Sequence, residues 1–199
     1  MTRSPNIRLS RREMLKRTAA AAGSMVAPLV VHGSVLGRNG TTAPSNRITV
    51  GSIGVGMMGR GHFRMFTEYP DVQLLALSDV DPWRRNDSAR VLEKAYGARQ
   101  PSGMFHGFQA YNDFRDLLSR DDIDAVIVAT GERWHPAISV LAAKAGKDIY
   151  CEKPISLTIR QARTMAETVR RHNRVFQTGL QQRNSPEYRK AMEMVHAGR

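Results

Sequence analysis

The sequence predicts an α/β fold with a doubly wound parallel sheet, and two observations lead to this prediction. Short apolar runs that read as strands alternate with helical stretches along residues 48–196. The apolar runs are continuous rather than alternating, as in residues 124–130 (DAVIVAT), which is expected for parallel strands covered by helices on both faces. A chain of 199 residues is long enough for one such domain.

The first predicted strand and helix enclose a glycine motif. Residues 48–53 read as a buried strand, and Gly54, Gly56 and Gly59 follow with the spacing G-x-G-x-x-G before a helix over about 58–68. Gly54 allows a tight turn, Gly56 lets a pyrophosphate approach the backbone, and Gly59 lets the helix pack close to the sheet. The free N–H groups at the start of this helix favour a phosphate group.

An acid at the end of the second strand completes the pattern of a dinucleotide site. The apolar run 72–77 leads to Asp79, which can accept hydrogen bonds from the ribose hydroxyls of adenosine. Its charge would repel a 2′-phosphate, which favours NAD over NADP, although Arg84 and Arg85 follow within reach of such a phosphate. NADP therefore stays as an alternative cofactor, and a glycine-rich turn in another α/β protein stays as an alternative to the site.

The middle of the chain continues the alternation. Helices are predicted over about 86–96 and 113–118, the second with acidic residues in its first turn. The strand 124–130 leads into a helix over about 136–145. This helix is predicted to end at Gly146, a residue type common after helices.

The last strands and helices are shorter or more polar. Residues 148–151 and 174–178 read as strands. Between these two strands, Thr158 and Gln161 predict a capping box for a helix that runs to about Asn173. Residues 186–196 read as a final helix.

The single cysteine, Cys151, is predicted to be a small buried hydrophobic side chain at a strand end. One cysteine excludes an intramolecular disulfide, and the scattered histidines show no metal-ligand spacing, so no metal is expected. His62 carries no pattern and is assigned no role.

The first 45 residues are predicted to be an export leader and linker, disordered or helical, that precedes the fold. Residues 10–16 (SRREMLK) stand before an apolar stretch, and a basic segment in this place is typical of an export signal. The paired arginines resemble the twin-arginine signal, which implies the twin-arginine export machinery as a partner and a periplasmic or secreted location. Glycine and proline interrupt the apolar stretch, so no stable membrane span is expected. The alternative is a disordered basic tail.

The leader also accounts for half of the net charge of +12. Residues 1–45 and residues 46–199 each contribute +6. The basic pairs of the second part lie in predicted helices without interleaved aromatic residues, so nucleic-acid binding is not expected. Because the twin-arginine pathway carries folded proteins, a dinucleotide enzyme exported in this way would need to keep its cofactor tightly bound.

Four segments follow strands at the carboxyl edge of the predicted sheet, where ligands bind in such folds. Together they resemble the Gfo/Idh/MocA family (glucose–fructose oxidoreductase and inositol dehydrogenase), and its secreted branch in particular. The matching segments, within residues 47–199, are GVGMMG (54–59), A-T-x-x-x-W-H (129–135), AGKDIYCEKP (145–154) and TGLQQR (178–183).

The resemblance implies a Rossmann-type domain that binds NAD, or NADP, and a sugar or polyol substrate. It makes Lys153 the active-site lysine, which hydrogen-bonds the hydroxyl or ketone being interconverted. It places Glu152 facing the cofactor ribose and the lysine. The implied cofactor-binding residues are Gly54, Gly56, Met57, Met58, Gly59, Asp79, Thr130, Trp134, His135, Glu152, Lys153 and Gln182.

The family continues into a second α/β domain that binds substrate. The expected division is therefore a signal peptide and linker (1–45), an NAD(P)-binding Rossmann domain (46–185) and a helix (186–199) leading into a second domain that this sequence lacks. The expected function is hydride transfer between a sugar or polyol hydroxyl and a tightly bound nicotinamide cofactor, with a homo-oligomer for the full-length protein. The alternatives are an NAD-dependent glycosidase of the same family, working by transient oxidation and elimination, and a non-catalytic nucleotide-binding scaffold.

Overall fold

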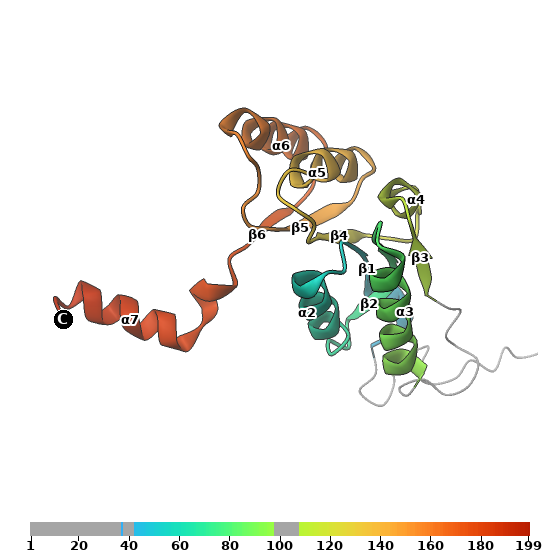
Figure 1. Cartoon of the computed structure of the whole chain (residues 1–199), viewed down its shortest axis with the longest axis horizontal. Helices are drawn as coiled ribbons and strands as arrows, with labels where there is room; N and C mark the ends of the chain where they lie inside the picture. Colours follow the sequence, from blue (N-terminus) through green and yellow to red (C-terminus); the bar gives the residue numbers. More distant parts are fainter. Residues whose placement is uncertain (1–36, 38–41, 98–107) are drawn as a thin grey trace, which may run out of the picture.

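The structure is a computed structural model that describes residue 37 and residues 42–97 and 108–199 (Figure 1). Most of the predicted export leader and residues 98–107 lie outside these residues. None of the described helices combines the length and the apolar composition that crossing a membrane requires.

Six parallel strands form one sheet in the order β3-β2-β1-β4-β5-β6. The chain starts in the middle of the sheet, builds outward to β3, and then crosses over to β4 on the other side of β1. The predicted doubly wound parallel sheet is confirmed. The strands are β1 (Ile48–Ile53), β2 (Val72–Ser78), β3 (Gln109–Tyr111), β4 (Ala125–Val128), β5 (Asp148–Glu152) and β6 (Phe176–Gly179).

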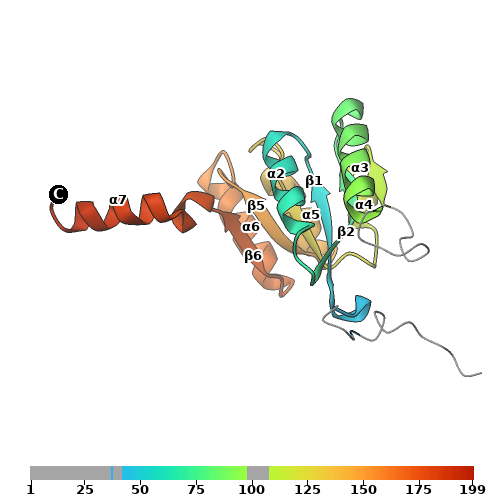
Figure 2. The same ribbon diagram turned by 90° about the horizontal axis from the view of Figure 1, so that it is seen from below.

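Helices cover both faces of the sheet, and a last helix extends away from it. In Figures 1 and 2, α2 and α3 lie on one face and α5 and α6 on the other. Helix α7 projects beyond β6 and has no buried residue. The helices are α2 (Met57–Phe66), α3 (Pro82–Gly97), α4 (Phe114–Leu118), α5 (His135–Lys144), α6 (Ile159–Arg171) and α7 (Pro186–His196), with 3-10 turns η2 (Pro44–Asn46) and η3 (Gln181–Asn184).

The central strand β4 shows why its sequence is apolar at every position. Val126 and Val128 pack with Ile138 of α5 in one buried cluster, whereas Ile127 packs with Phe63 of α2 in a second cluster on the opposite face. Successive side chains of a strand point to opposite faces, and here both faces are covered by helices. The continuous apolar run is therefore the expected pattern of a strand with no solvent-exposed face.

Several boundaries differ from the predictions, and two of them are set by side chains that cap an element. Helix α3 begins at Pro82 rather than near residue 86, because the Asp81 carboxylate accepts the N–H groups of Trp83 at 2.9 Å and Arg84 at 3.3 Å. An acid followed by proline is a helix-start signal that the sequence did contain. Strand β6 begins two residues later than predicted, because the N–H of Val175 is taken by the Asp148 side chain.

The predicted caps of α5 and α6 are present. Gly146 follows Ala145, the C-cap of α5, and has a φ of 77°, in the left-handed conformation that glycine adopts without strain. Thr158 accepts the N–H of Gln161 at the start of α6. The Gln161 side chain reaches back to the N–H of Leu157, one residue earlier than in an ordinary capping box.

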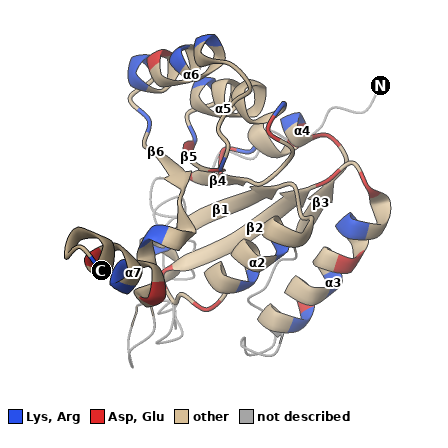
Figure 3. Ribbon diagram, turned by 60° about the vertical axis from the view of Figure 1, so that its left-hand side comes forward, with Lys and Arg blue, Asp and Glu red and all other residues tan. Residues whose placement is uncertain are grey.

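Lys and Arg side chains are spread over several helices rather than gathered on one (Figure 3). Several of them pair with nearby acids at half-exposed positions, for example Arg120 with Asp122 at 2.7 Å and Arg115 with Asp113 at 2.9 Å. Exposed pairs of this kind contribute about 0–1 kcal/mol each. They keep the surface charge mixed and do not define a binding face.

Candidate functional site

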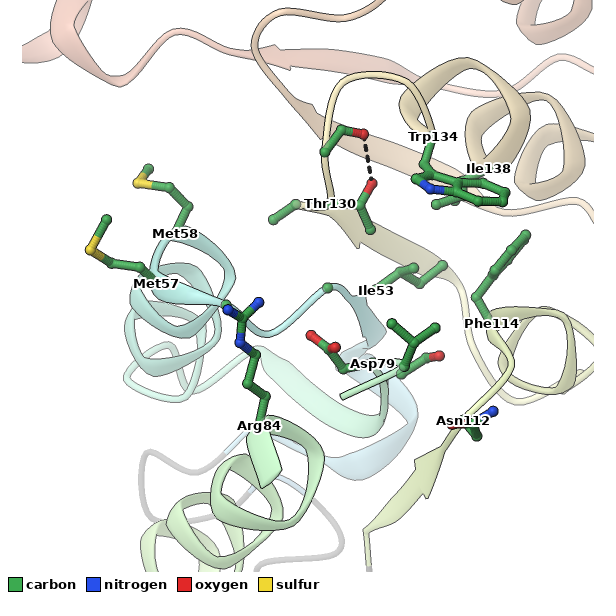
Figure 4. Close-up of a pocket in the computed structure, with 16 residues that line it drawn as sticks. Ile53, Met57, Met58, Asp79, Arg84, Asn112, Phe114, Thr130, Trp134 and Ile138 are labelled. Carbon is green, nitrogen blue, oxygen red and sulfur yellow. Dashed lines mark hydrogen bonds between the residues drawn. The ribbon is translucent and has the colours of Figure 1, made fainter. Parts of the chain in front are cut away.

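A cavity of about 480 Å³ opens at the carboxyl ends of β1, β2 and β4 (Figure 4). This is the place where the strand order reverses, and a ligand crevice is expected there in a doubly wound sheet. Its volume is within the usual range of small-molecule sites. The lining residues are Ile53, Gly54, Gly56, Met57, Met58, Ser78, Asp79, Val80, Arg84, Asn112, Phe114, Ala129, Thr130, Gly131, Trp134 and Ile138.

The glycine motif forms one wall of the cavity. Gly54 turns the chain with a φ of 85°, and a Cβ there would lie 2.7 Å from the carbonyl oxygen of Ala129. Gly56 is the N-cap of α2, with no side chain capping the helix, and a Cβ there would meet only the Arg84 guanidinium at 3.4 Å. The start of α2 therefore presents backbone N–H groups to the cavity, an arrangement that suits an anionic group.

Gly59 does not line the cavity but allows it to form. A Cβ at this position would lie 1.9 Å from the carbonyl oxygen of Gly54, so only glycine lets α2 approach the turn this closely. This is the packing constraint expected of the third glycine in the motif.

Asp79 lies at the cavity and also braces the glycine turn. Its Oδ2 accepts the N–H of Val55 at 2.8 Å, and its Oδ1 accepts the N–H of Asp81 at 2.9 Å. Each carboxylate oxygen can accept more than one hydrogen bond, so ribose hydroxyls remain acceptable partners. The sequence predicted the ligand contact but not the bond to the turn.

The two arginines that follow have different surroundings. Arg84 lines the cavity, where its Nε lies 3.5 Å from a carboxylate oxygen of Asp81. Arg85 instead donates from Nη1 to the carbonyl oxygen of Asp79 at 2.7 Å and to the side chain of Asn112 at 3.0 Å. Arg85 therefore does not line the cavity itself but bonds Asn112, which does, and its reach to a 2′-phosphate stays a prediction.

The opposite wall of the cavity is apolar. The Trp134 ring lies beside Ile138 and faces the part of the cavity that Phe114 also borders (Figure 4). Val80 adds a further apolar surface after β2. A planar aromatic group fits such a wall, because offset stacking and apolar burial act together. Of these residues the sequence had singled out Trp134 alone.

Seven of the twelve predicted cofactor-binding residues line this cavity, and five do not. The seven are Gly54, Gly56, Met57, Met58, Asp79, Thr130 and Trp134. The other five comprise Gly59 under the turn, two residues buried nearby, and two exposed residues on neighbouring segments. His135 is buried at the start of α5, and Glu152 is buried at the end of β5. Lys153, directly after β5, and Gln182, in η3, are exposed.

His135 joins two loops rather than facing the cavity. Its Nδ1 lies 2.8 Å from the carbonyl oxygen of Pro154, and its Nε2 lies 3.0 Å from that of Thr130. The neutral ring donates from one nitrogen at a time, so the tautomer decides which carbonyl receives the proton. His135 thus bridges the segments after β4 and β5 and does not line the cavity, and its cofactor contact stays a prediction.

Glu152 is turned inward, against a residue that sequence reasoning missed. Its Oε1 lies 2.6 Å from Nε2 of His62 on α2, and its Oε2 accepts the N–H of Lys153 at 3.2 Å. The Tyr150 hydroxyl lies 3.4 Å from Oε1, and burial, followed by the charge of Glu152, raises the pKa of Tyr150. The signal in the sequence was slight: His62 stands three residues after Gly59, on the buried face of the predicted helix.

The predicted burial of Cys151 is confirmed. Its side chain has no exposed surface, and burial raises the pKa of the thiol to about 11, which keeps it protonated and unreactive at neutral pH. Within residues 42–97 and 108–199, no three His, Cys, Asp or Glu side chains come together in a way that could hold a metal ion.

Several curated relatives resemble the chain over most of its length. A glycosyl hydrolase family 109 protein of Shewanella pealeana is 30% identical over 176 residues, which cover 83% of this chain and 38% of that protein. A myo-inositol 2-dehydrogenase of Thermotoga maritima is 30% identical over 149 residues, which cover 75% of this chain and 41% of that protein. The chain thus spans about two fifths of the length of these relatives.

Solved structures agree with these relatives. The structure of scyllo-inositol dehydrogenase from Lactobacillus casei, with bound cofactor NAD(H) and scyllo-inositol, matches with a TM-score of 0.63 and 27% identity, over 76% of this chain and 42% of that one. The family model described as "Oxidoreductase family, NAD-binding Rossmann fold" (GFO_IDH_MocA) matches residues 48–180. With its parallel sheet, glycine turn and cavity at the switch point, the chain belongs to this Gfo/Idh/MocA family of oxidoreductases.

Proposed function

We propose that the chain is the NAD(P)-binding part of an oxidoreductase that transfers a hydride between a sugar or polyol hydroxyl and a tightly bound nicotinamide cofactor. The observation that carries this proposal is the cavity formed by the glycine turn, Asp79 and the Trp134 wall at the switch point of the sheet. The names of two similar proteins, a myo-inositol 2-dehydrogenase and a scyllo-inositol dehydrogenase with bound NAD(H), support a polyol as the substrate class.

The residues of the cavity fit a dinucleotide by charge and by shape. The open start of α2 at Gly56 would hold the diphosphate, Asp79 would accept the ribose hydroxyls, and Trp134 with Phe114 would border the adenine ring. The side chains of Met57 and Met58 flank the same helix start and would shield the diphosphate from water (Figure 4).

Lys153 is the chain's own candidate for proton chemistry. It directly follows β5 at the carboxyl edge of the sheet, and its side chain is exposed rather than paired with a carboxylate. Its ammonium would donate a hydrogen bond to the oxygen of the reacting hydroxyl or ketone and stabilise alkoxide charge there. The nicotinamide ring, when bound, supplies the hydride acceptor or donor.

A glycosidase that works through transient oxidation is the second candidate. It is favoured by the relative that is named a glycosyl hydrolase family 109 protein and is 30% identical to this chain. Such an enzyme regenerates its cofactor in every turnover, whereas a dehydrogenase does not. Net formation of NADH from a polyol therefore supports the dehydrogenase, and release of sugar without net NADH supports the glycosidase.

Binding of NADH to the purified chain tests the proposal directly. The chain has two tryptophans, Trp134 on the cavity wall and Trp83, which does not line it. We expect bound NADH to shield Trp134 from the collisional quencher acrylamide in Trp83→Phe, where only Trp134 remains. In Trp134→Phe, the remaining Trp83 is 68% exposed and does not line the cavity, so NADH should leave its quenching by acrylamide unchanged.

Isothermal titration calorimetry with NADH and NADPH gives the affinity independently of the fluorescence. Nucleotide binding by all three proteins, together with the fluorescence difference, supports the site. A wild-type chain that is folded by circular dichroism but takes up neither nucleotide contradicts the proposed function.

We also propose that the chain is exported by the twin-arginine machinery to the periplasm or beyond. The proposal rests on the SRREMLK segment and the apolar stretch after it. A reporter that is active only when it folds before export, fused to residues 1–45, should appear in the periplasm. Replacing both Arg11 and Arg12 by lysine should retain it in the cytoplasm, and export that persists in this variant contradicts the proposal.

A further inference from the structure

A buried carboxylate stands directly before the proposed catalytic lysine. Glu152 is 4% exposed and His62 is 7% exposed, and their side chains meet at 2.6 Å across the interface between β5 and α2. A contact of this length between a carboxylate oxygen and a ring nitrogen is a hydrogen bond. Burial of the carboxylate without such a partner would be costly. The pair therefore fixes the Glu152 side chain in one position.

The neighbouring strand leaves room for this carboxylate. Gly179 of β6 pairs with Glu152, and a Cβ on Gly179 would lie 2.6 Å from Oε1 of Glu152 and 2.8 Å from the Tyr150 hydroxyl. Tyr150 also packs edge-on against the His62 ring, with centroids 5.2 Å apart. Residues from α2, β5 and β6 thus surround the buried carboxylate of Glu152.

The second carboxylate oxygen of Glu152 connects the Glu152–His62 pair to the backbone of Lys153. Oε2 accepts the N–H of Lys153 at 3.2 Å, while the carbonyl oxygen of the next residue, Pro154, lies 2.8 Å from Nδ1 of His135. The Lys153–Pro154 dipeptide is consequently held at both ends. His135 of α5 contacts the Pro154 carbonyl directly, whereas His62 of α2 acts on the Lys153 N–H through the Glu152 carboxylate.

Helix α2 connects this hold to the cavity. Its first residue follows Gly56 at the proposed diphosphate position, and His62 lies about one and a half turns further along the same helix. A short helix moves as a unit, so any shift of its N-terminus is carried to the His62 ring. The geometry thus links the nucleotide site to the backbone of Lys153.

We infer that His62 is a positioning residue for Lys153, acting through the Glu152 carboxylate and coupling the lysine to occupation of the nucleotide site. A role of His62 in catalysis rests on the proposed function, but the contacts from His62 through Glu152 to Lys153 are present in the chain without any ligand. A pair that only stabilised the fold would contribute to the unfolding free energy without determining the environment of the Lys153 N–H.

The Lys153 amide can be observed by NMR in the full 199-residue chain. Labelling with ¹⁵N-lysine gives one amide signal for each of six lysines, and Lys153→Arg identifies the signal of interest. In His62→Phe, which keeps a ring beside Tyr150 but removes the nitrogen, this signal should shift. Its hydrogen exchange should accelerate by roughly ten- to a hundredfold, the factor for one lost hydrogen bond to a charged group. Its response to added NADH should also be lost.

Two further variants make the result specific. His62→Gln keeps an N–H donor and should restore the wild-type signal, whereas His172→Phe, an exposed position at the end of α6, should leave it unchanged. Gly179→Ala, which displaces the carboxylate from the other side, should shift it. If His62→Phe does not fold, His62→Gln decides: a signal close to that of wild type supports the inference, and one displaced as in Gly179→Ala overturns it.

A Lys153 signal that stays in place in folded His62→Phe overturns the inference and leaves nucleotide binding untouched. Failure of the wild-type chain to bind NADH removes the proposed function instead. The shift between wild type and His62→Phe is measured without nucleotide and remains interpretable in that case.

Discussion

Replacing Gly59 by alanine is expected to prevent the chain from forming the nucleotide cavity. The added Cβ would lie 1.9 Å from the carbonyl oxygen of Gly54 and 2.9 Å from its carbonyl carbon. Both are backbone atoms, so no side-chain rotation relieves the clash. Gly54 cannot retreat either, because its own turn is packed against the carbonyl oxygen of Ala129. Either α2 leaves the sheet or the turn opens, and both outcomes destroy the site.

We expect Gly59→Ala to lower the free energy of unfolding by roughly 4 kcal/mol or more, in the range of severe core substitutions, and to abolish NADH binding. Gly61→Ala is the matched control, since it lies two residues later in α2 and a Cβ there meets no atom within 4 Å. It should stabilise the chain by about 0.5–1 kcal/mol, the usual gain of alanine over glycine in a helix. Urea unfolding followed by circular dichroism measures both changes, and equal midpoints for the two variants would refute the clash argument.

The parts of the fold that the sequence predicted correctly are those encoded by local patterns. The strand Ile48–Ile53 and the helix Pro186–His196 have the predicted bounds, and Gly146 ends α5 as its residue type indicates. Glycine spacing, caps and runs of apolar residues act over a few neighbours, so they can be read without knowing the tertiary structure. The parallel, doubly wound sheet then follows from the regular alternation of strand and helix, whereas the order of its strands comes from the structure.

The contacts that the sequence did not reveal join residues far apart in the chain. His62 and Glu152 are 90 positions apart, and Asp79 bonds the Val55 amide 24 positions away. Helical spacing shows that His62 lies on a buried face, but not which strand end it meets. That partner is set by the packing of α2 across the sheet, which depends on side-chain volumes at many positions.

The same limit applies to the walls of the cavity. Trp134 was identified because it falls inside a recognisable segment, whereas Val80 and Phe114 lie in stretches without a motif. Arg84 and Arg85 are adjacent and of one residue type, yet only Arg84 lines the cavity. On a helix, neighbouring residues point about 100° apart, so the helix start at Pro82 decides which arginine lines the cavity.

Asp79 offers the sharpest test of cofactor choice, because one side chain favours one nucleotide and disfavours the other. Its carboxylate would lose hydrogen bonds to two ribose hydroxyls on replacement by alanine, and its repulsion of a 2′-phosphate would vanish. Each effect is worth about 1.5–3 kcal/mol at a partly buried site, so the ratio of NADPH to NADH affinity should rise by about a hundredfold or more in Asp79→Ala. Calorimetric titration with both nucleotides measures this ratio.

The ratio, rather than either affinity alone, isolates the ligand contact. Asp79→Ala also deprives the Val55 N–H of its acceptor, which loosens the glycine turn and weakens the binding of NADH and NADPH alike. This common loss cancels in the ratio. Arg84 supplies the complementary control: its guanidinium lines the cavity, so adding Arg84→Ala to Asp79→Ala should remove much of the gain in NADPH affinity. If the ratio does not change in Asp79→Ala although both affinities fall, Asp79 serves only to brace the turn, and the ribose lies elsewhere in the cavity.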